Sequence, residues 1–187
     1  MKHPSRILRD LTILSVATLT CQFGFAQEGP PAPEVTEHHK VLHKENGNWS
    51  GEMKIWMSPD APPMSMPFTE SNKLLGDGLW IMSEFESGPF QGRGQFGYDP
   101  QTKKYMGTWI DNMSPHMSIM EGDYDKDKQL MTWHSKVFDV MAKKTKYNKS
   151  TVKFNEDGTR LFTMYQRYDE NGEWAKSFEM HYKKKTA

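Results

Sequence analysis

From Trp49 onward, the chain consists of short segments in which apolar and polar residues alternate, each followed by a turn signal. Alternation with a period of two is typical of a β-strand with one buried face. About ten such segments follow at spacings of roughly 10 to 14 residues, and no helical pattern intervenes. We expect strands over 49–57, 68–75, 79–86, 92–98, 105–112, 117–124, 129–138, 145–154, 159–168 and 173–183.

Short turns join these segments. Gly76-Asp77-Gly78 and Asn171-Gly172 favour tight hairpins, and Pro100 suits the second position of a turn. Short hairpins connect antiparallel neighbours, whereas parallel strands need a long crossover. An open meander of this length would leave two exposed edges, and closing the sheet removes them. The sequence therefore predicts an all-β fold, an antiparallel up-and-down β-barrel, with a two-sheet sandwich as the alternative.

Residues 34–45 are the one good helical candidate. His39 and Leu42 fall on one face at helical spacing, and Gly47 follows the end of the segment. Residues 58–67 contain four prolines, so we expect a long loop there rather than the interior of a strand. The prediction is a single barrel domain over 34–187 with a short N-terminal helix.

Residues 1–26 have the features of a secretory signal peptide: a basic start, an apolar run and small residues before the expected cleavage after Ala26. Cys21 offers a rival interpretation as a lipid attachment site. Residues 27–33 are rich in Pro and Gly and are expected to form a flexible lead-in. These features predict an exported protein, periplasmic or secreted.

The charge balance excludes some partners. Lys and Arg number 24, as do Asp and Glu, and the only basic block is 183–185. A neutral chain without a basic stripe is not expected to bind nucleic acid. Cys21 is the only cysteine, so cleavage would leave no disulfide, and stability must come from a buried core. We expect no integral membrane segment after signal cleavage.

Two motifs carry a family resemblance. Gly47-Asn48-Trp49 follows the predicted helix and is similar to the Gly-x-Trp element of lipocalins, in which the Trp plugs one end of the barrel. The central block resembles the domain-of-unknown-function family 1579 (DUF1579), whose members are lipocalin-like. The resemblance covers roughly residues 38–183 and implies a barrel with no established activity. Its motifs are Gly97-Tyr98-Asp99-Pro100, Lys104-Tyr105-x-Gly107-x-Trp109-x-Asp111-x-Met113-Ser114 and Glu121-Gly122-x-Tyr124-Asp125.

A closed barrel of this size can hold one small ligand. The many aromatic and Met side chains favour a small apolar or amphipathic molecule in its interior. Asp111 and Glu121 flank one short loop and are the preferred polar groups, with His134 as a further candidate. The candidate ligand-binding residues are Trp109, Asp111, His116, Glu121 and Glu179.

Other functions stay open. The paired carboxylates could act as acid and base, but the sequence contains no recognised nucleophile, phosphate loop or paired-His metal helix, so binding is favoured over catalysis. We predict no cofactor. A barrel with a filled core that acts as a structural or interaction module is the main alternative.

Metal and haem binding are the remaining alternatives. Thioether and imidazole groups suit Cu(I), and Met113, His116, Met117 and Met120 are weak candidates for such a site. Haem could be held by His116, His134 or His181. His39 and His43 have a helical spacing that can bind metal, although a polar helix face explains them as well.

Overall fold

The computed structural model describes residues 33–58 and 61–186. The expected signal peptide, Cys21 and all of the lead-in except Pro33 lie outside the described residues. Residues Glu34–Ala187 form one compact unit.

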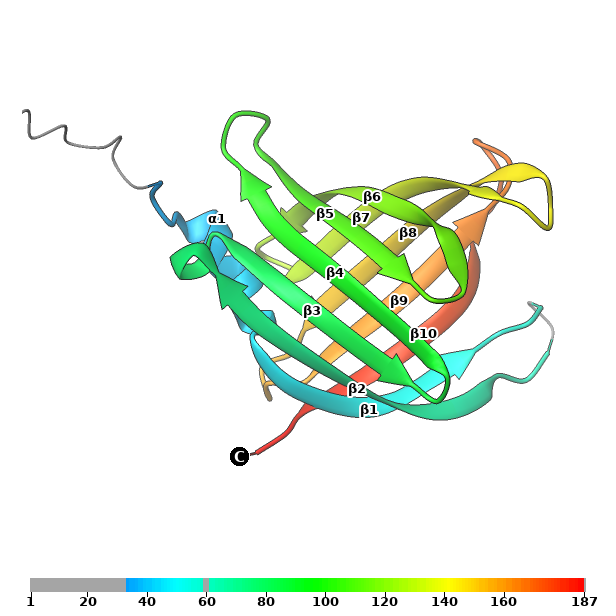
Figure 1. The fold of residues 1–187 in the computed structure, drawn as a ribbon, viewed down its shortest axis with the longest axis horizontal. Helices are drawn as coiled ribbons and strands as arrows, with labels where there is room; N and C mark the ends of the chain where they lie inside the picture. Colours follow the sequence, from blue (N-terminus) through cyan, green and yellow to red (C-terminus); the bar gives the residue numbers. More distant parts are fainter. Residues whose placement is uncertain (1–32, 59–60, 187) are drawn as a thin grey trace, which may run out of the picture. The chain divides into compact units, whose positions relative to one another are not determined.

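Ten antiparallel strands form a closed barrel in which each strand pairs with its neighbours in the chain and β1 pairs with β10 (Figure 1). This confirms the predicted up-and-down barrel and excludes the two-sheet alternative. The pairing of Trp49 with Lys184 and of Ile55 with Phe178 closes the sheet. The strands are β1 (Gly47–Ile55), β2 (Met64–Leu75), β3 (Trp80–Ser87), β4 (Phe90–Asp99), β5 (Lys104–Asp111), β6 (Ser114–Asp125), β7 (Leu130–Asp139), β8 (Lys144–Phe154), β9 (Arg160–Arg167) and β10 (Ala175–Lys184).

A short helix lies at one end of the barrel (Figure 1). α1 (Glu37–Leu42) continues into the 3₁₀ turn η1 (His43–Glu45), so the helix begins later than predicted. Thr36 is extended, and its N–H donates to Nδ1 of His39 (3.1 Å), which fixes the start of α1. His39 and Leu42 are buried. His43 Nε2 lies 2.8 Å from the carbonyl oxygen of Gly78, in the turn η2 (Gly76–Gly78) between β2 and β3.

The predicted loop over 58–67 is shorter in the structure. β2 begins at Met64 and includes Pro67, which pairs with Glu52 of β1. β2 pairs with β3 only from Thr69 onward, so one side of the strand has no ladder partner at Pro67. Proline lacks an N–H and is tolerated at such an edge position. The prediction was therefore wrong at 64–67, because edge and central positions of one strand cannot be told apart in the sequence.

Glycines opposite aromatic residues shape the barrel wall. In five directly paired positions the aromatic ring lies so close that a Cβ on the glycine would come within 3.0 Å of it. Covering a glycine in this way lets the sheet bend and places the ring against the backbone. The pairs are Gly51–Phe68, Gly94–Trp109, Gly97–Trp80, Gly107–Phe96 and Gly122–Trp133.

Two apolar clusters fill the barrel, and Phe162 packs against both of them. The first contains Leu42 of α1 and lies beneath the helix; Met131 at its centre is fully buried. The second lies against β1, β2, β3 and β10 and includes Trp49 and Phe68. Burial of this kind stabilises the fold by about 25 cal/mol per Å² of apolar surface.

Candidate functional site

The two ends of the barrel differ in how far water reaches the interior. Next to α1, the inward-facing Trp49, Tyr105 and Tyr182 are each 3% exposed. At the opposite end, several inward-facing apolar side chains are only half-buried, although Ser87 at the end of β3 is 2% exposed. An inward side chain of a closed barrel meets solvent only through an open end, so this end is accessible. We call this accessible region the open half; it includes Ile55, Met66, Phe90, Trp109, Met164 and Phe178.

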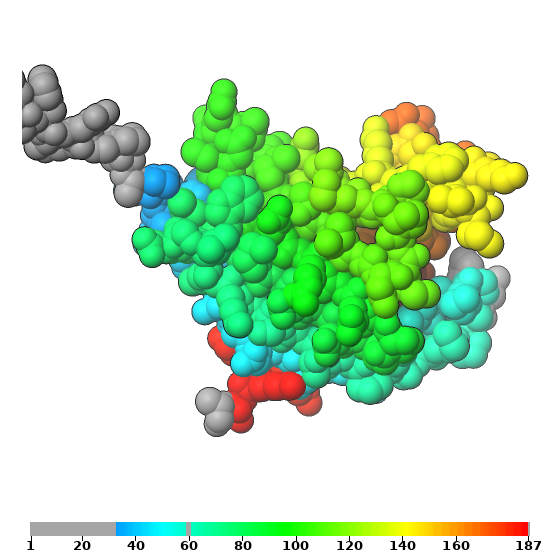
Figure 2. Space-filling model, viewed as in Figure 1, coloured from blue at the N-terminus to red at the C-terminus, as the bar shows by residue number. Residues whose placement is uncertain are grey.

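The space-filling view shows which segments surround this end. The yellow turn that joins β7 to β8 lies above the cyan segment at the end of β1 (Figure 2). These segments belong to the end of the barrel that is opposite α1 (Figure 1). The helical end is called the sealed end below.

A buried ionic cluster, the Arg160 cluster, closes the sealed end. It comprises Arg160, Glu45, Glu70, Tyr182 and Trp49. Arg160 is 3% exposed; its Nη1 lies 2.5 Å from Glu45 Oε2 and its Nη2 bonds Glu70 Oε1. The guanidinium carbon lies 3.9 Å from the centroid of the Tyr182 ring and 4.5 Å from that of Trp49. Trp49, the predicted plug of the barrel end, therefore lies at the sealed end as one wall of this cluster.

Hydrogen bonds complete the Arg160 cluster. Tyr182 donates its hydroxyl proton to Glu70 Oε2 (2.8 Å), and Trp49 Nε1 donates to the carbonyl oxygen of Glu45 (2.7 Å). Asn72 Nδ2 donates both to Glu70 Oε1 and to the same carbonyl oxygen of Glu45. Through these bonds, η1 is tied to strands β1, β2, β9 and β10, which makes the Arg160 cluster a structural closure.

The charges of the Arg160 cluster do not balance, because one guanidinium faces two carboxylates. Burial, only partly opposed by Arg160, raises the pKa of Glu45 to about 6, and the charge of Glu70 adds to this rise. Burial by itself would lower the pKa of Arg160, but Glu70 and Glu45 outweigh it and raise that pKa. Glu45 is thus the group in this cluster that takes up a proton in mildly acidic solution.

This arrangement predicts a pH-dependent stability. An exposed Glu titrates near pH 4.5, whereas folded Glu45 titrates near 6. The folded form therefore binds the proton more tightly, and the stability that this contributes is complete below about pH 4.5 and is lost as the pH rises through 6. Relative to Glu45→Gln, which cannot titrate, the wild-type protein should lose about 2 kcal/mol between pH 4.5 and 7.

Urea unfolding of both proteins at pH 4.5, 5.5 and 7 measures this difference. Glu52→Gln, at an exposed position of the same strand as Trp49, is the matched control and should show no such change with pH. A pH-independent difference between the wild-type protein and Glu45→Gln would contradict the assignment.

An aromatic wall lines the open half on β3, β4 and β5. The indole of Trp109 lies against the backbone of β4, where a Cβ on Gly92 would come within 2.1 Å of it. The centroid of the Phe85 ring lies 6.3 Å from that of Trp109 and 5.8 Å from that of Phe90. One face of the Trp109 indole therefore rests on the strand, and its exposed surface belongs to the interior.

Asp111 lies beside this wall at the end of β5. Its Oδ2 accepts a hydrogen bond from Trp109 Nε1 (3.2 Å), and its Oδ1 accepts one from the backbone N–H of Met113 (2.9 Å). Trp109 and Asp111 are both among the predicted ligand-binding residues, and the structure brings these two side chains together.

The opposite wall, on β7 to β9, carries polar side chains beside the apolar Val137 and Met164. Asn148 Nδ2 lies 3.3 Å from Ser135 Oγ, and Gln166 pairs with Asn148 in the sheet. At the rim, Lys146 Nζ lies 3.5 Å from Asp139 Oδ2. Hydrogen bonds from the backbone of Ala142 and from the Tyr168 hydroxyl lower the pKa of Asp139 to about 2. The open half thus has one aromatic wall and one wall that carries most of its polar side chains.

Three predicted candidates lie elsewhere. Glu121 is exposed on the outer face of β6, where it pairs with His134. Glu179 is on the outer face of β10, with its carboxylate oxygens 3.2 Å from Lys176 Nζ and 2.8 Å from His181 Nε2. His116 is exposed on β6. Because Glu121 and Glu179 alternate with inward-facing Gly122 and Met180, the expectation that they line the interior is corrected.

The candidate metal ligands are not gathered at one point. Met113 and Met117 are 74% and 55% exposed, whereas Met120 packs against the first apolar cluster. Over residues 33–58 and 61–186, no three His, Cys, Asp or Glu side chains are grouped so that they could hold a metal ion. His39 and His43 are engaged with Thr36 and Gly78, as described above.

The Arg160 cluster was not predicted from the sequence. A signal for it exists, because Arg160 alternates in phase with Phe162 in β9, and Glu70 alternates in phase with Phe68 in β2. A charged residue on the apolar face of a strand is rarely buried unless it is paired. Two such residues of opposite charge could therefore have indicated a buried ion pair.

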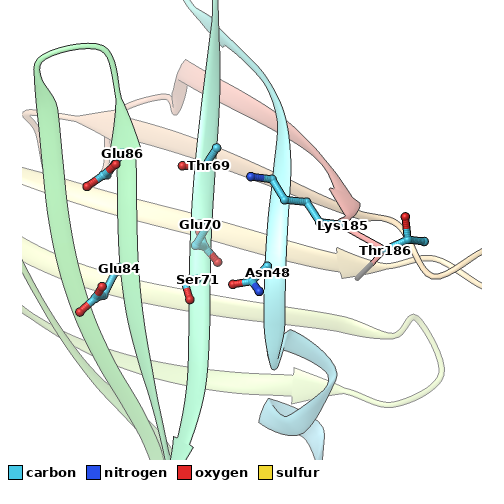
Figure 3. A pocket seen from close by; sticks show the side chains of 8 residues that line it. All are labelled: Asn48, Thr69, Glu70, Ser71, Glu84, Glu86, Lys185 and Thr186. Atoms are coloured by element: carbon cyan, nitrogen blue, oxygen red, sulfur yellow. The ribbon is translucent and has the colours of Figure 1, made fainter.

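Two hollows lie on the outer wall rather than in the interior. One, of about 410 Å³, is lined by Gly51, Glu52, Lys54, His181 and Lys183. The other, of about 460 Å³, crosses β1, β2 and β3 and is polar (Figure 3). Its lining includes Glu70, although the carboxylate of that residue is bonded to Arg160. The residues lining this second hollow are Asn48, Thr69, Glu70, Ser71, Glu84, Glu86, Lys185 and Thr186.

A closed ten-strand antiparallel barrel with a helix at one end and an accessible opposite end defines a lipocalin-like barrel. A family model described as "Protein of unknown function (DUF1579)" matches residues 34–184, and the chain belongs to this family. No curated protein matches the chain. Among the described residues, no helix has the length and apolar character needed to cross a bilayer.

Proposed function

We propose that this protein is an exported binding protein that holds one small apolar or amphipathic molecule in the open half of its barrel. The observation that carries the proposal is the half-burial of inward-facing Phe90, Trp109, Met164 and Phe178 in a closed barrel. Apolar surface that water reaches inside a concave site gains free energy when a ligand covers it.

The two walls support an amphipathic ligand. An apolar chain can lie along the aromatic wall and the second apolar cluster, whereas a polar head can face Ser135, Asn148 and Gln166. Met66 and Met164 add flexible, polarisable surface, which tolerates ligands of different shape. Export is supported by the sequence features of residues 1–26.

Binding of the neutral fluorophore N-phenyl-1-naphthylamine tests the proposal. The wild-type protein should enhance its fluorescence with a micromolar Kd. Met164→Lys places a charged side chain in the open half and should weaken binding by about tenfold or more, since burying apolar surface beside a charge is unfavourable. Met117→Lys, the same substitution at an exposed position of β6, is the matched control and should leave the Kd unchanged.

Equal binding by Met164→Lys and the wild-type protein would place the fluorophore outside the open half. The absence of binding to the wild-type protein would favour the alternative of a filled barrel that acts through its outer surface. The first apolar cluster fills the interior beneath α1, so the open half decides between these functions.

A further inference from the structure

Charged side chains are few at the inward positions of the open half. In the part of the chain that the structure describes, the half-buried ones are Asp111, Asp139 and Lys146, and the exposed Lys144 pairs with Asp139 at the rim. Lys146 faces Asp139 across the β7–β8 pair (3.5 Å). Asp111 has no Lys, Arg or His partner among the described ion pairs; its hydrogen bonds come from an indole N–H and a backbone N–H. One half-buried negative charge is therefore left without a cation.

The surroundings of that charge are aromatic. Asp111 adjoins the indole of Trp109, which together with Phe85 and Phe90 forms the aromatic wall. Organic cations bind over the faces of aromatic rings, and Trp is the strongest of these partners. A carboxylate beside such rings adds a direct charge interaction that an anionic ligand cannot make.

We propose that the open half selects amphiphiles with an organic ammonium head over those with a carboxylate head. The head lies between Asp111 and Trp109, and the chain extends along Phe90 and the second apolar cluster. This inference rests on the proposed function and specifies the ligand class for the same site.

Three ligands with equal chain length test the inference: decyltrimethylammonium, decanoate and the neutral monodecanoylglycerol. Isothermal titration calorimetry at low salt, with each ligand below its micelle concentration, gives the three Kd values. Decyltrimethylammonium should bind the wild-type protein about tenfold more tightly than decanoate, within the range of cation–π and charge interactions at partly buried sites.

Asp111→Asn should weaken binding of decyltrimethylammonium by about tenfold and change that of monodecanoylglycerol by less than about twofold. The asparagine can still accept the hydrogen bond from Met113, so the turn after β5 is preserved. Glu121→Gln, the same change on the outer face of β6, is the matched control and should alter none of the three. If Asp111→Asn does not fold, the wild-type comparison still tests the inference.

Decanoate that binds as tightly as decyltrimethylammonium would overturn the inference but not the proposed function. The same holds if Asp111→Asn binds decyltrimethylammonium as tightly as the wild-type protein. Failure of all three ligands to bind would overturn the proposed function itself, and the inference with it.

Discussion

Replacing Arg160 with Met should lower the free energy of unfolding by roughly 3–5 kcal/mol. The substitution removes the only cation of the Arg160 cluster and leaves the Glu45 and Glu70 side chains buried at 14% and 7% exposure. The rings of Trp49 and Tyr182 also lose the guanidinium that stacks on them. The measurement is denaturant unfolding at pH 7, followed by circular dichroism and Trp fluorescence.

Two variants show whether the loss comes from buried charge. Arg93 pairs with Glu84 on the outer wall, where both side chains are at least 60% exposed, and Arg93→Met should cost less than about 1 kcal/mol. A chain with Glu45→Gln, Glu70→Gln and Arg160→Met together has no buried charge there and should recover more than half of the loss. Equal costs for Arg160→Met and Arg93→Met would show that the Arg160 cluster does not hold the sealed end together.

Gly51→Ala should destabilise the protein by roughly 3 kcal/mol or more, because the barrel has no space for a side chain there. A Cβ at this position would lie 1.8 Å from the backbone oxygen of His181 and 3.0 Å from the ring of Phe68. Gly51 belongs to β1, and His181 belongs to β10, the pair that closes the barrel. The backbones must therefore move apart, which weakens the closure directly.

Hydrogen exchange and urea unfolding measure this effect. Faster exchange of the β1 and β10 amides than of the β4 and β5 amides would locate the damage at the closure. Gly158→Ala is the matched control: nothing lies within 4 Å of its Cβ, and its φ of +79° adds strain of only about 1 to 2 kcal/mol. A Gly51→Ala protein no less stable than Gly158→Ala would refute the predicted clash.

The strand order was predictable because turn residues and period-two alternation agree along the chain. Every predicted strand has its counterpart, and the closure of β1 on β10 follows from the need to remove edges. Pro67 was wrongly predicted to lie in a loop. A proline is tolerated in this strand only because β3 does not pair with β2 at that position. The point where this pairing ends is a property of the folded sheet and is absent from the local sequence.

Which face of each strand points into the barrel was harder to predict than where each strand lies in the sequence. In β6, Met117 and Ile119 are exposed, whereas Met120 is turned inward, so hydrophobicity does not identify the inner face. Glu121 was chosen as a candidate because it was expected to flank the same short loop as Asp111, whereas in the structure it lies within β6 and pairs with Met106. Asp111 shares its strand face with Trp109 and Gly107, which pair with inward-facing Gly94 and Phe96 of β4. Arg160 was missed because its two partners are distant in the chain.

The proposed binding role depends on where a ligand lies, and the ε-methyl groups of methionine report this directly. NMR of the protein labelled with ¹³C at these methyl groups, titrated with N-phenyl-1-naphthylamine, separates inside from outside. Met66 packs against the second apolar cluster and Met164 lies on the inner face of β9, whereas Met113 and Met117 are exposed. Our account predicts saturable shifts of Met66 and Met164 with Met113 and Met117 unchanged; saturable shifts confined to Met113 and Met117 would contradict it.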